Sequence, residues 1–172
     1  MSDTGTDTAP DPIFSPEDGI GDLWVKAYQG EVLGEQLFDR MAAQLEENGE
    51  AEHAAKMRVL ATMERLTKEA IAPALERAGI STQPDPEMLA NAEILAGATA
   101  TIPWNELMAS FEPITAQYSA MYVRIGELDL AEQAAADLLV AHELALRNFA
   151  RAELAGHSDT SLDDINALAH MR

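Results

Sequence analysis

Apolar residues recur along most of the chain at the three- and four-residue spacing that is typical of amphipathic helices. Four long segments with this spacing are predicted to be helices: residues 22–47, 51–78, about 102–125 and about 130–154. Asn48 and Gly49 separate the first two segments, and the residues GELDL separate the last two. The pattern therefore predicts an all-α protein built from two helical hairpins.

The connection between the two hairpins, residues 79–103, is too long for a tight turn. Asp85 followed by Pro86 predicts one short helix inside it, with the sequence PEMLANAEILAG. We place the start of the next long helix after Thr101, as its N-cap. Helices of about 27 residues are roughly 40 Å long, and a connection of this size can span that length. We therefore expect the second and third long helices to be parallel, with both hairpin turns at the same end of a four-helix bundle.

The parts of the chain outside the bundle read differently. Residues 1–20 are acidic and rich in proline, which predicts a disordered leader. Residues 21–156 form the predicted bundle, with residues 79–103 as its crossover. Residues 157–172 form a tail in which Ser161 and Asp164, at capping-box spacing, predict a short helix.

Composition and charge narrow the range of partners. The formal net charge is −19, which disfavours binding to nucleic acid and to anionic membranes. No apolar run approaches the roughly 18 residues of a membrane span, and the first residues lack the features of a signal peptide. We therefore expect a cytoplasmic protein. Because the chain has no cysteine, any metal ion must be held by Asp, Glu or His.

Polar residues interrupt the apolar faces of three of the four long helices. Glu31 and Glu35 lie on the inner face of the first helix, Glu64 on that of the second and His142 on that of the last. Glu143 lies at the rim, beside His142. Buried charges of this kind cost several kcal/mol unless they are paired, protonated or bound to a cation.

The heights of these residues can be compared by counting from each hairpin turn. With both turns at one end, Glu35, Glu64 and His142 share one level to within about 1.5 Å of helix rise. Glu31 lies about one turn further out, level with Lys68, which could neutralise it. The count thus predicts a polar centre inside the bundle.

Two interpretations of this centre stay open. In the first, the carboxylates and the imidazole hold a metal ion, for which iron, manganese or zinc fits the donors. In the second, no metal binds, and Glu35 and Glu64 form a hydrogen-bonded cluster with His142, Tyr118 and Lys68 that fixes helix register.

Three segments, GEVLGE in the first helix, MERLTKE in the second and AHELAL in the last, together with the long middle connection, resemble the ferritin-like superfamily of rubrerythrins and di-iron carboxylate oxygenases. The resemblance covers residues 21–156. It implies that each hairpin gives a Glu from its first helix and a Glu-x-x-His from its second. Glu31 or Glu35 matches the first Glu, Glu64 the second, and Glu143 the Glu of the last helix.

The chain also differs from that pattern. Thr67 and Leu146 stand where the family has its two histidines, and the third long helix has no glutamate on its inner face. These differences favour a mononuclear or altered site that uses His142, or a ferritin-like fold without metal. In the first case the resemblance implies an iron- or manganese-dependent oxidoreductase with oxygen or peroxide chemistry and Tyr118 as a nearby donor.

The alternative function is that of a non-catalytic structural or interaction protein with a metal-free polar cluster. The aliphatic residues Val25, Val32 and Leu33 point away from the predicted inner face of the first helix. They favour association into a homodimer. The sequence identifies neither a substrate nor any further catalytic residue.

Overall fold

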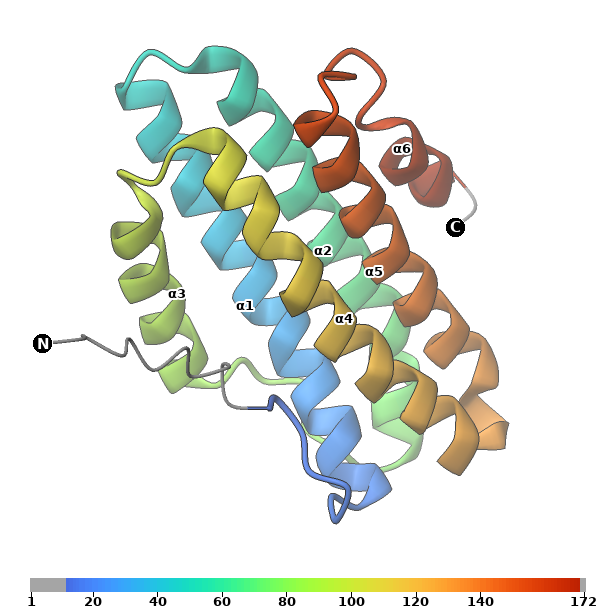
Figure 1. The fold of residues 1–172 in the computed structure, drawn as a ribbon. Coiled ribbons are helices and arrows are strands. Elements are labelled where there is room, and N and C mark those ends of the chain that lie inside the picture. Colours follow the sequence, from blue (N-terminus) through green and yellow to red (C-terminus); the bar gives the residue numbers. More distant parts are fainter. Residues whose placement is uncertain (1–11, 171–172) are drawn as a thin grey trace, which may run out of the picture.

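The computed structural model describes residues 12–170, and every regular element in that range is a helix (Figure 1). The four long helices are α1 (Ile20–Glu47), α2 (Ala51–Arg77), α4 (Trp104–Leu128) and α5 (Gln133–Leu154). The shorter ones are α3 (Pro86–Thr99), α6 (Asp163–His170) and a single 3-10 turn, η1 (Leu130–Glu132). The predicted all-α class is confirmed.

Local signals explain most of the helix ends. Gly49 and Gly156 follow α1 and α5 with φ values of 83° and 77°, which glycine adopts without strain. The Asp85 carboxylate caps α3 by accepting a hydrogen bond from the backbone N–H of Glu87 at 2.8 Å. The predicted start of α4 after Thr101 is wrong, because the helix begins at Trp104. The residue before a proline avoids helical backbone angles, which keeps Ile102 out of the helix.

The long helices pack as two hairpins, α1 with α2 and α4 with α5, and further contacts join α1 to α4 and α2 to α5. In Figure 1, α2 and α4 run in the same direction. Helix α3, which follows α2 and precedes α4 in the chain, runs the opposite way along the outside of α1. His53 near the start of α2 stacks on Trp104, the first residue of α4, with ring centroids 4.0 Å apart. The long connection is thus a crossover that makes α2 and α4 parallel.

The two hairpin turns lie at opposite ends of the molecule, so the expectation that they share one end is wrong. Near the start of α1, the indole N–H of Trp24 donates to Asp129, in the α4–α5 turn, at 3.0 Å. At the end of α2, Arg77 pairs with Glu132 of the same turn at 2.6 Å. Because α2 begins at its turn whereas α4 ends at its own, parallel helices must place the two turns at opposite ends.

The predicted common level survives this correction. Positions 14 or 15 residues from a turn lie near the middle of a helix of about 27 residues, whichever end the count starts from. The apolar core is accordingly divided along the helices. One cluster, around Phe38, Leu60 and Phe149, lies towards the α1–α2 turn, and the other, around Trp24 and Leu75, lies towards the α4–α5 turn. The polar residues lie between the two clusters.

Helix α3 covers a face of α1 that we expected to be exposed. The buried side chain of Gln29 holds the start of the crossover, since its amide donates to the Gln83 carbonyl and accepts from the Asp85 N–H, both at 2.9 Å. Val32 is only 2% exposed and belongs to the second apolar cluster. Leu33 is half-buried as well, so the proposed dimer surface on α1 is corrected to Val25 alone, which is 43% exposed.

Residues at both ends of the described chain pack on the long helices. The predicted leader falls partly on residues 1–11, outside the described part, but residues 12–19 differ from that expectation. Ile13 and Phe14 pack against the second cluster, and the Ile13 N–H donates to Gln117 at 3.1 Å. Helix α6 packs on α5 and α2 where the tail was predicted to be helical. None of the helices in residues 12–170 is long and apolar enough to cross a membrane.

A buried ion pair fixes the end of the molecule at which α2 and α4 begin. The Lys56 ammonium lies 2.6 Å from the Glu153 carboxylate, and both side chains are buried. The second oxygen of Glu153 accepts from the Trp104 indole at 2.9 Å, and Lys56 also donates to Ser158. The pair therefore joins α2, α4, α5 and the segment before α6.

Replacing Lys56 by Met is expected to lower the free energy of unfolding by about 3–5 kcal/mol, because the Glu153 carboxylate would stay buried without its cation. Arg65→Met is the matched control, since Arg65 pairs with Glu69 on the exposed face of the same helix, where an ion pair contributes below about 1 kcal/mol. Urea denaturation measures both. If both variants lose the same free energy of unfolding, the Lys56–Glu153 pair does not stabilise the fold as a buried ion pair.

Candidate metal centre

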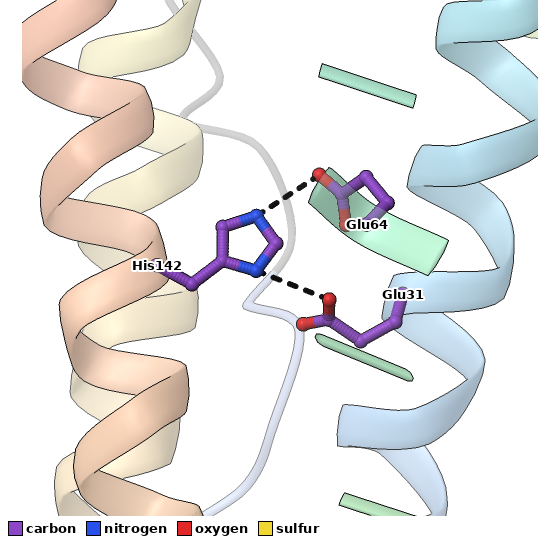
Figure 2. Close-up of side chains that lie close together, drawn as sticks. All are labelled: Glu31, Glu64 and His142. Carbon is purple, nitrogen blue, oxygen red and sulfur yellow. Dashed lines mark ion pairs between the residues drawn. The ribbon is translucent and has the colours of Figure 1, made fainter. Parts of the chain in front are cut away.

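Glu31 of α1, Glu64 of α2 and His142 of α5 meet in the middle of the protein (Figure 2). The imidazole lies between the two carboxylates, with Nδ1 3.2 Å from Oε2 of Glu31 and Nε2 3.3 Å from Oε1 of Glu64. His142 is fully buried, and the Glu31 side chain is 1% exposed. One donor atom from each residue lies within 4.8 Å of the other two, so this buried group could hold a metal ion.

The structure brings Glu31, rather than Glu35, to His142. Four residues of α-helix advance by about 400°, so Glu35 is rotated roughly 40° from Glu31 towards the edge of the inner face. There the Lys68 ammonium donates to the Glu35 carboxylate, and both side chains are partly exposed. The expected pairing of Lys68 with Glu31 is therefore wrong, and Glu35 lies outside the group of donors.

The contacts of His142 have the distances of ion pairs but not the geometry of hydrogen bonds. Both ring nitrogens of His142 and Oε2 of Glu31 are buried and have no hydrogen-bond partner among residues 12–170. Buried polar atoms are rarely left in this state without a ligand or ordered water. The arrangement therefore suits a cation bound by one ring nitrogen of His142 and by carboxylate oxygens of Glu31 and Glu64.

Tyr122 is the residue of the centre that sequence reasoning missed. Its buried hydroxyl donates to Oε1 of Glu31 at 3.2 Å, which orients that carboxylate. Burial raises its pKa well above the ordinary value, so the hydroxyl keeps its proton. The available signal was its position four residues after Tyr118, on the same side of α4. Tyr118 itself is half-buried beside Gly30, and its role as a donor stays a prediction.

Glu64 and Glu143 hold their protons more tightly than they would in water. Burial raises the pKa of Glu64 to about 7, although the nearby His142 opposes this shift. Burial likewise raises the pKa of Glu143 well above its ordinary value. For His142, burial lowers the pKa, but the Glu31 and Glu64 carboxylates more than compensate, and the net shift is strongly upward. The centre thus stores protons that a metal ion would have to displace.

The two positions at which the ferritin-like pattern has histidine contribute no ligand here. Leu146 is buried in the first apolar cluster. Thr67 is buried too, and its hydroxyl donates to the Met63 carbonyl at 3.0 Å. Glu143, the predicted Glu of the last helix, is buried next to His142 and faces a cavity of about 170 Å³ that Glu31 and Glu64 also line.

Comparison of the chain with protein-family models, with curated proteins and with solved structures found no match in any of the three.

Gly34 makes the room that Glu64 occupies. A Cβ atom on Gly34 would lie 2.6 Å from the carboxyl carbon of Glu64, closer than van der Waals contact allows. The glycine lets α2 bring a carboxylate against the backbone of α1, and Glu64 would have to move if a side chain were added. Gly97 of α3 has open space at the same position, with nothing within 4 Å of an added Cβ.

Gly34→Ala is expected to destabilise the protein by about 1–2 kcal/mol, because the overpacking outweighs the gain in helix propensity. Gly97→Ala, the matched control, is expected to stabilise it by up to about 1 kcal/mol. Denaturant unfolding of the metal-free proteins measures both effects. If both alanines stabilise, the close seating of Glu64 on Gly34 is refuted.

The metal-free protein is expected to lose stability as the pH rises from about 4.5 to about 7. Glu64 binds its proton more tightly folded than unfolded, so its contribution is complete below the unfolded pKa and disappears as the pH passes the folded one. The shift of Glu64 alone corresponds to roughly 3 kcal/mol. Glu143 changes in the same direction from about pH 4.5 upward, and His142 does so from about pH 6.5 upward.

The pH dependence is measured by urea unfolding at several pH values in the presence of a chelator. Glu64→Gln should flatten the slope in this window, whereas the exposed control Glu69→Gln should leave it intact. If the stability of the wild type is constant or rises between pH 4.5 and 7, the raised pKa of Glu64 is ruled out.

Proposed function

We propose that this protein is a ferritin-like four-helix bundle that binds a single iron or manganese ion through Glu31, Glu64 and His142 and acts as a metal-dependent oxidoreductase. The observation that carries the proposal is the meeting of three buried donor residues, of which the His142 ring nitrogens and one Glu31 oxygen have no hydrogen-bond partner among residues 12–170. Glu143 supplies a further carboxylate from the same turn of α5.

The arrangement of helices supports the ferritin-like part of the proposal. Two antiparallel hairpins are joined by a long crossover, and α2 is parallel to α4. The donors come from the middle of α1, α2 and α5, where bundles of that class place their metal ligands. Tyr122, from the middle of α4, adds a hydroxyl that contacts Glu31 instead of a fourth carboxylate.

The donor set supports iron or manganese. Carboxylate oxygens suit manganese, and imidazole nitrogen suits iron as it also suits zinc. The resemblance to di-iron carboxylate proteins favours iron or manganese over zinc. One ring nitrogen of His142 would bind the ion together with one oxygen from each of Glu31 and Glu64, whose donor atoms lie within 4.8 Å of one another.

The residues of the chain prepare this site for redox chemistry. An iron or manganese ion bound here would supply reactivity towards dioxygen or peroxide. The two apolar clusters keep bulk water away, and Tyr122 holds the Glu31 carboxylate in place. Glu143 and Tyr118 lie at the adjoining cavity with raised pKa values, so both can hold a proton there at neutral pH.

The second candidate is a non-catalytic bundle whose metal-free cluster sets the register of the helices. The observation in its favour is the position of His142 between two carboxylates at 3.2 and 3.3 Å, where a protonated ring neutralises charge from both sides. In this case the protein acts through association, as a homodimer, and Val25 remains exposed on α1 for that contact.

Protein purified without chelator and reconstituted without oxygen with Fe(II) or Mn(II) is expected to retain about one ion per chain, the number that a single set of three donors holds. Glu31→Gln, Glu64→Gln and His142→Gln should each reduce the bound metal by about tenfold or more, because each removes a ligand atom. Glu35→Gln is the matched control, since Glu35 pairs with Lys68 instead. Elemental analysis after gel filtration gives the metal content.

Two results would overturn the metal proposal: wild-type protein that retains no transition metal, or Glu35→Gln that loses as much metal as Glu64→Gln. A metal-free wild type, together with a monomer–dimer equilibrium that shifts on mutation of Val25, supports the second candidate. If the wild type binds no metal and the double variant Glu64→Gln, His142→Leu unfolds, the charges of Glu64 and His142 are needed for the fold.

A further inference from the structure

A cavity leads from the surface to the candidate metal centre. It has a volume of about 170 Å³ and lies between α1, α3 and α4, with Glu31 and Glu64 at its inner end. Its walls are formed mainly by apolar side chains: Leu33, Leu37 and Phe38 of α1, Leu95 of α3, and Phe111 and Ile114 of α4. Leu95 and Ile114 are 42% and 48% exposed, so they mark the mouth.

The inner end of the cavity is polar and contains no basic side chain among its lining residues. Three carboxyl groups, of Glu31, Glu64 and Glu143, reach it together with the phenols of Tyr118 and Tyr122. An anionic ligand would meet acidic groups without a positively charged partner. A cationic ligand would compete with the metal ion for the same carboxylates. An uncharged ligand avoids both costs.

The glycines of α1 keep this cavity open. Gly30 and Gly34 both line it, and an added Cβ would lie 2.8 Å from the Tyr118 ring and 2.6 Å from the Glu64 carboxyl carbon. Without side chains at these two positions, the floor of the cavity is backbone, and the acidic groups remain accessible from the apolar side.

We propose that this cavity binds a small uncharged apolar molecule, aromatic or branched aliphatic, with its inner atoms beside Glu31, Glu64 and Glu143. The volume is close to that of an apolar cavity of about 150 Å³ that holds benzene in another protein. Ligands longer than that extend through the mouth between Leu95 and Ile114. The role of this molecule as organic substrate rests on the proposed metal function, whereas its binding does not.

The proposal is tested with three probes of similar size and different charge: ethylbenzene, benzylamine and benzoate. Ligand-observed NMR with the metal-free protein is expected to show binding of ethylbenzene and none of benzoate. In protein loaded with Mn(II), benzylamine should bind more weakly than ethylbenzene, because the ion occupies the carboxylates. In protein loaded with Mn(II), the paramagnetic ion should accelerate the relaxation of the ethylbenzene protons. That acceleration reports that the ligand and the ion are neighbours.

A matched pair of variants on α4 locates the ligand. Ile114→Trp places a larger side chain at the mouth and should weaken ethylbenzene binding by about tenfold or more, because it fills space that the ligand needs. Val123→Trp is the control, since Val123 is 50% exposed on the same helix and does not line the cavity. Both positions are exposed, so both variants should fold.

The proposal is overturned if ethylbenzene does not bind, if Ile114→Trp binds it as well as the control does, if benzoate binds more tightly, or if benzylamine binds more tightly to the Mn(II)-loaded protein. These outcomes are separate from the metal result. Ethylbenzene binding to a protein that retains no metal leaves the cavity proposal standing and refutes the proposed function. Metal retention without ethylbenzene binding refutes the cavity proposal and leaves the proposed metal function standing.

Discussion

The contact of His142 with Glu31 and Glu64 is the constraint around which the rest of the structure is arranged. Removing ionised groups from water costs several kcal/mol per charge, and only close partners compensate for that cost. The three groups come from α1, α2 and α5, so a relative shift of one helical turn, about 5.4 Å, would separate them. The apolar clusters on either side favour packing in general, but they tolerate small shifts. The polar centre favours one register.

Other features of the chain make this register possible. Gly34 admits the Glu64 carboxylate, Tyr122 holds Glu31 from α4, and the Lys56–Glu153 pair fixes the helix ends on one side. The crossover contributes as well. Because α3 returns the chain to the end where α2 began, α5 runs antiparallel to α2, and the middle of each long helix falls at the same height. Gln29 secures the start of that crossover with two partly buried hydrogen bonds.

The sequence predicted the helices, the crossover and the polar interruptions on three inner faces, since each depends on local periodicity or loop length. It failed where the answer depends on orientation. Counting residues gives the height of a Cα atom but neither the rotation that moves Glu35 to the edge nor the reach of Lys68. Tyr122 was missed in the sequence, because a hydroxyl leaves no trace in the hydrophobic pattern. Val32 looked exposed because the pattern of α1 contains no information about where α3 packs.

In the centre, a metal ion and protons compete for the same lone pairs on the carboxylates and the imidazole. In the metal-free protein, His142 lies between Glu31 and Glu64, and the raised pKa values of His142, Glu64 and Glu143 favour bound protons. A metal ion needs a neutral ring and charged carboxylates, so its binding releases protons and becomes stronger as the pH rises. The same rise in pH weakens the metal-free cluster. Burial alone therefore does not determine whether the centre holds protons or a metal ion. The balance between the protonated and the metal-bound state depends on the pH and on the metal concentration.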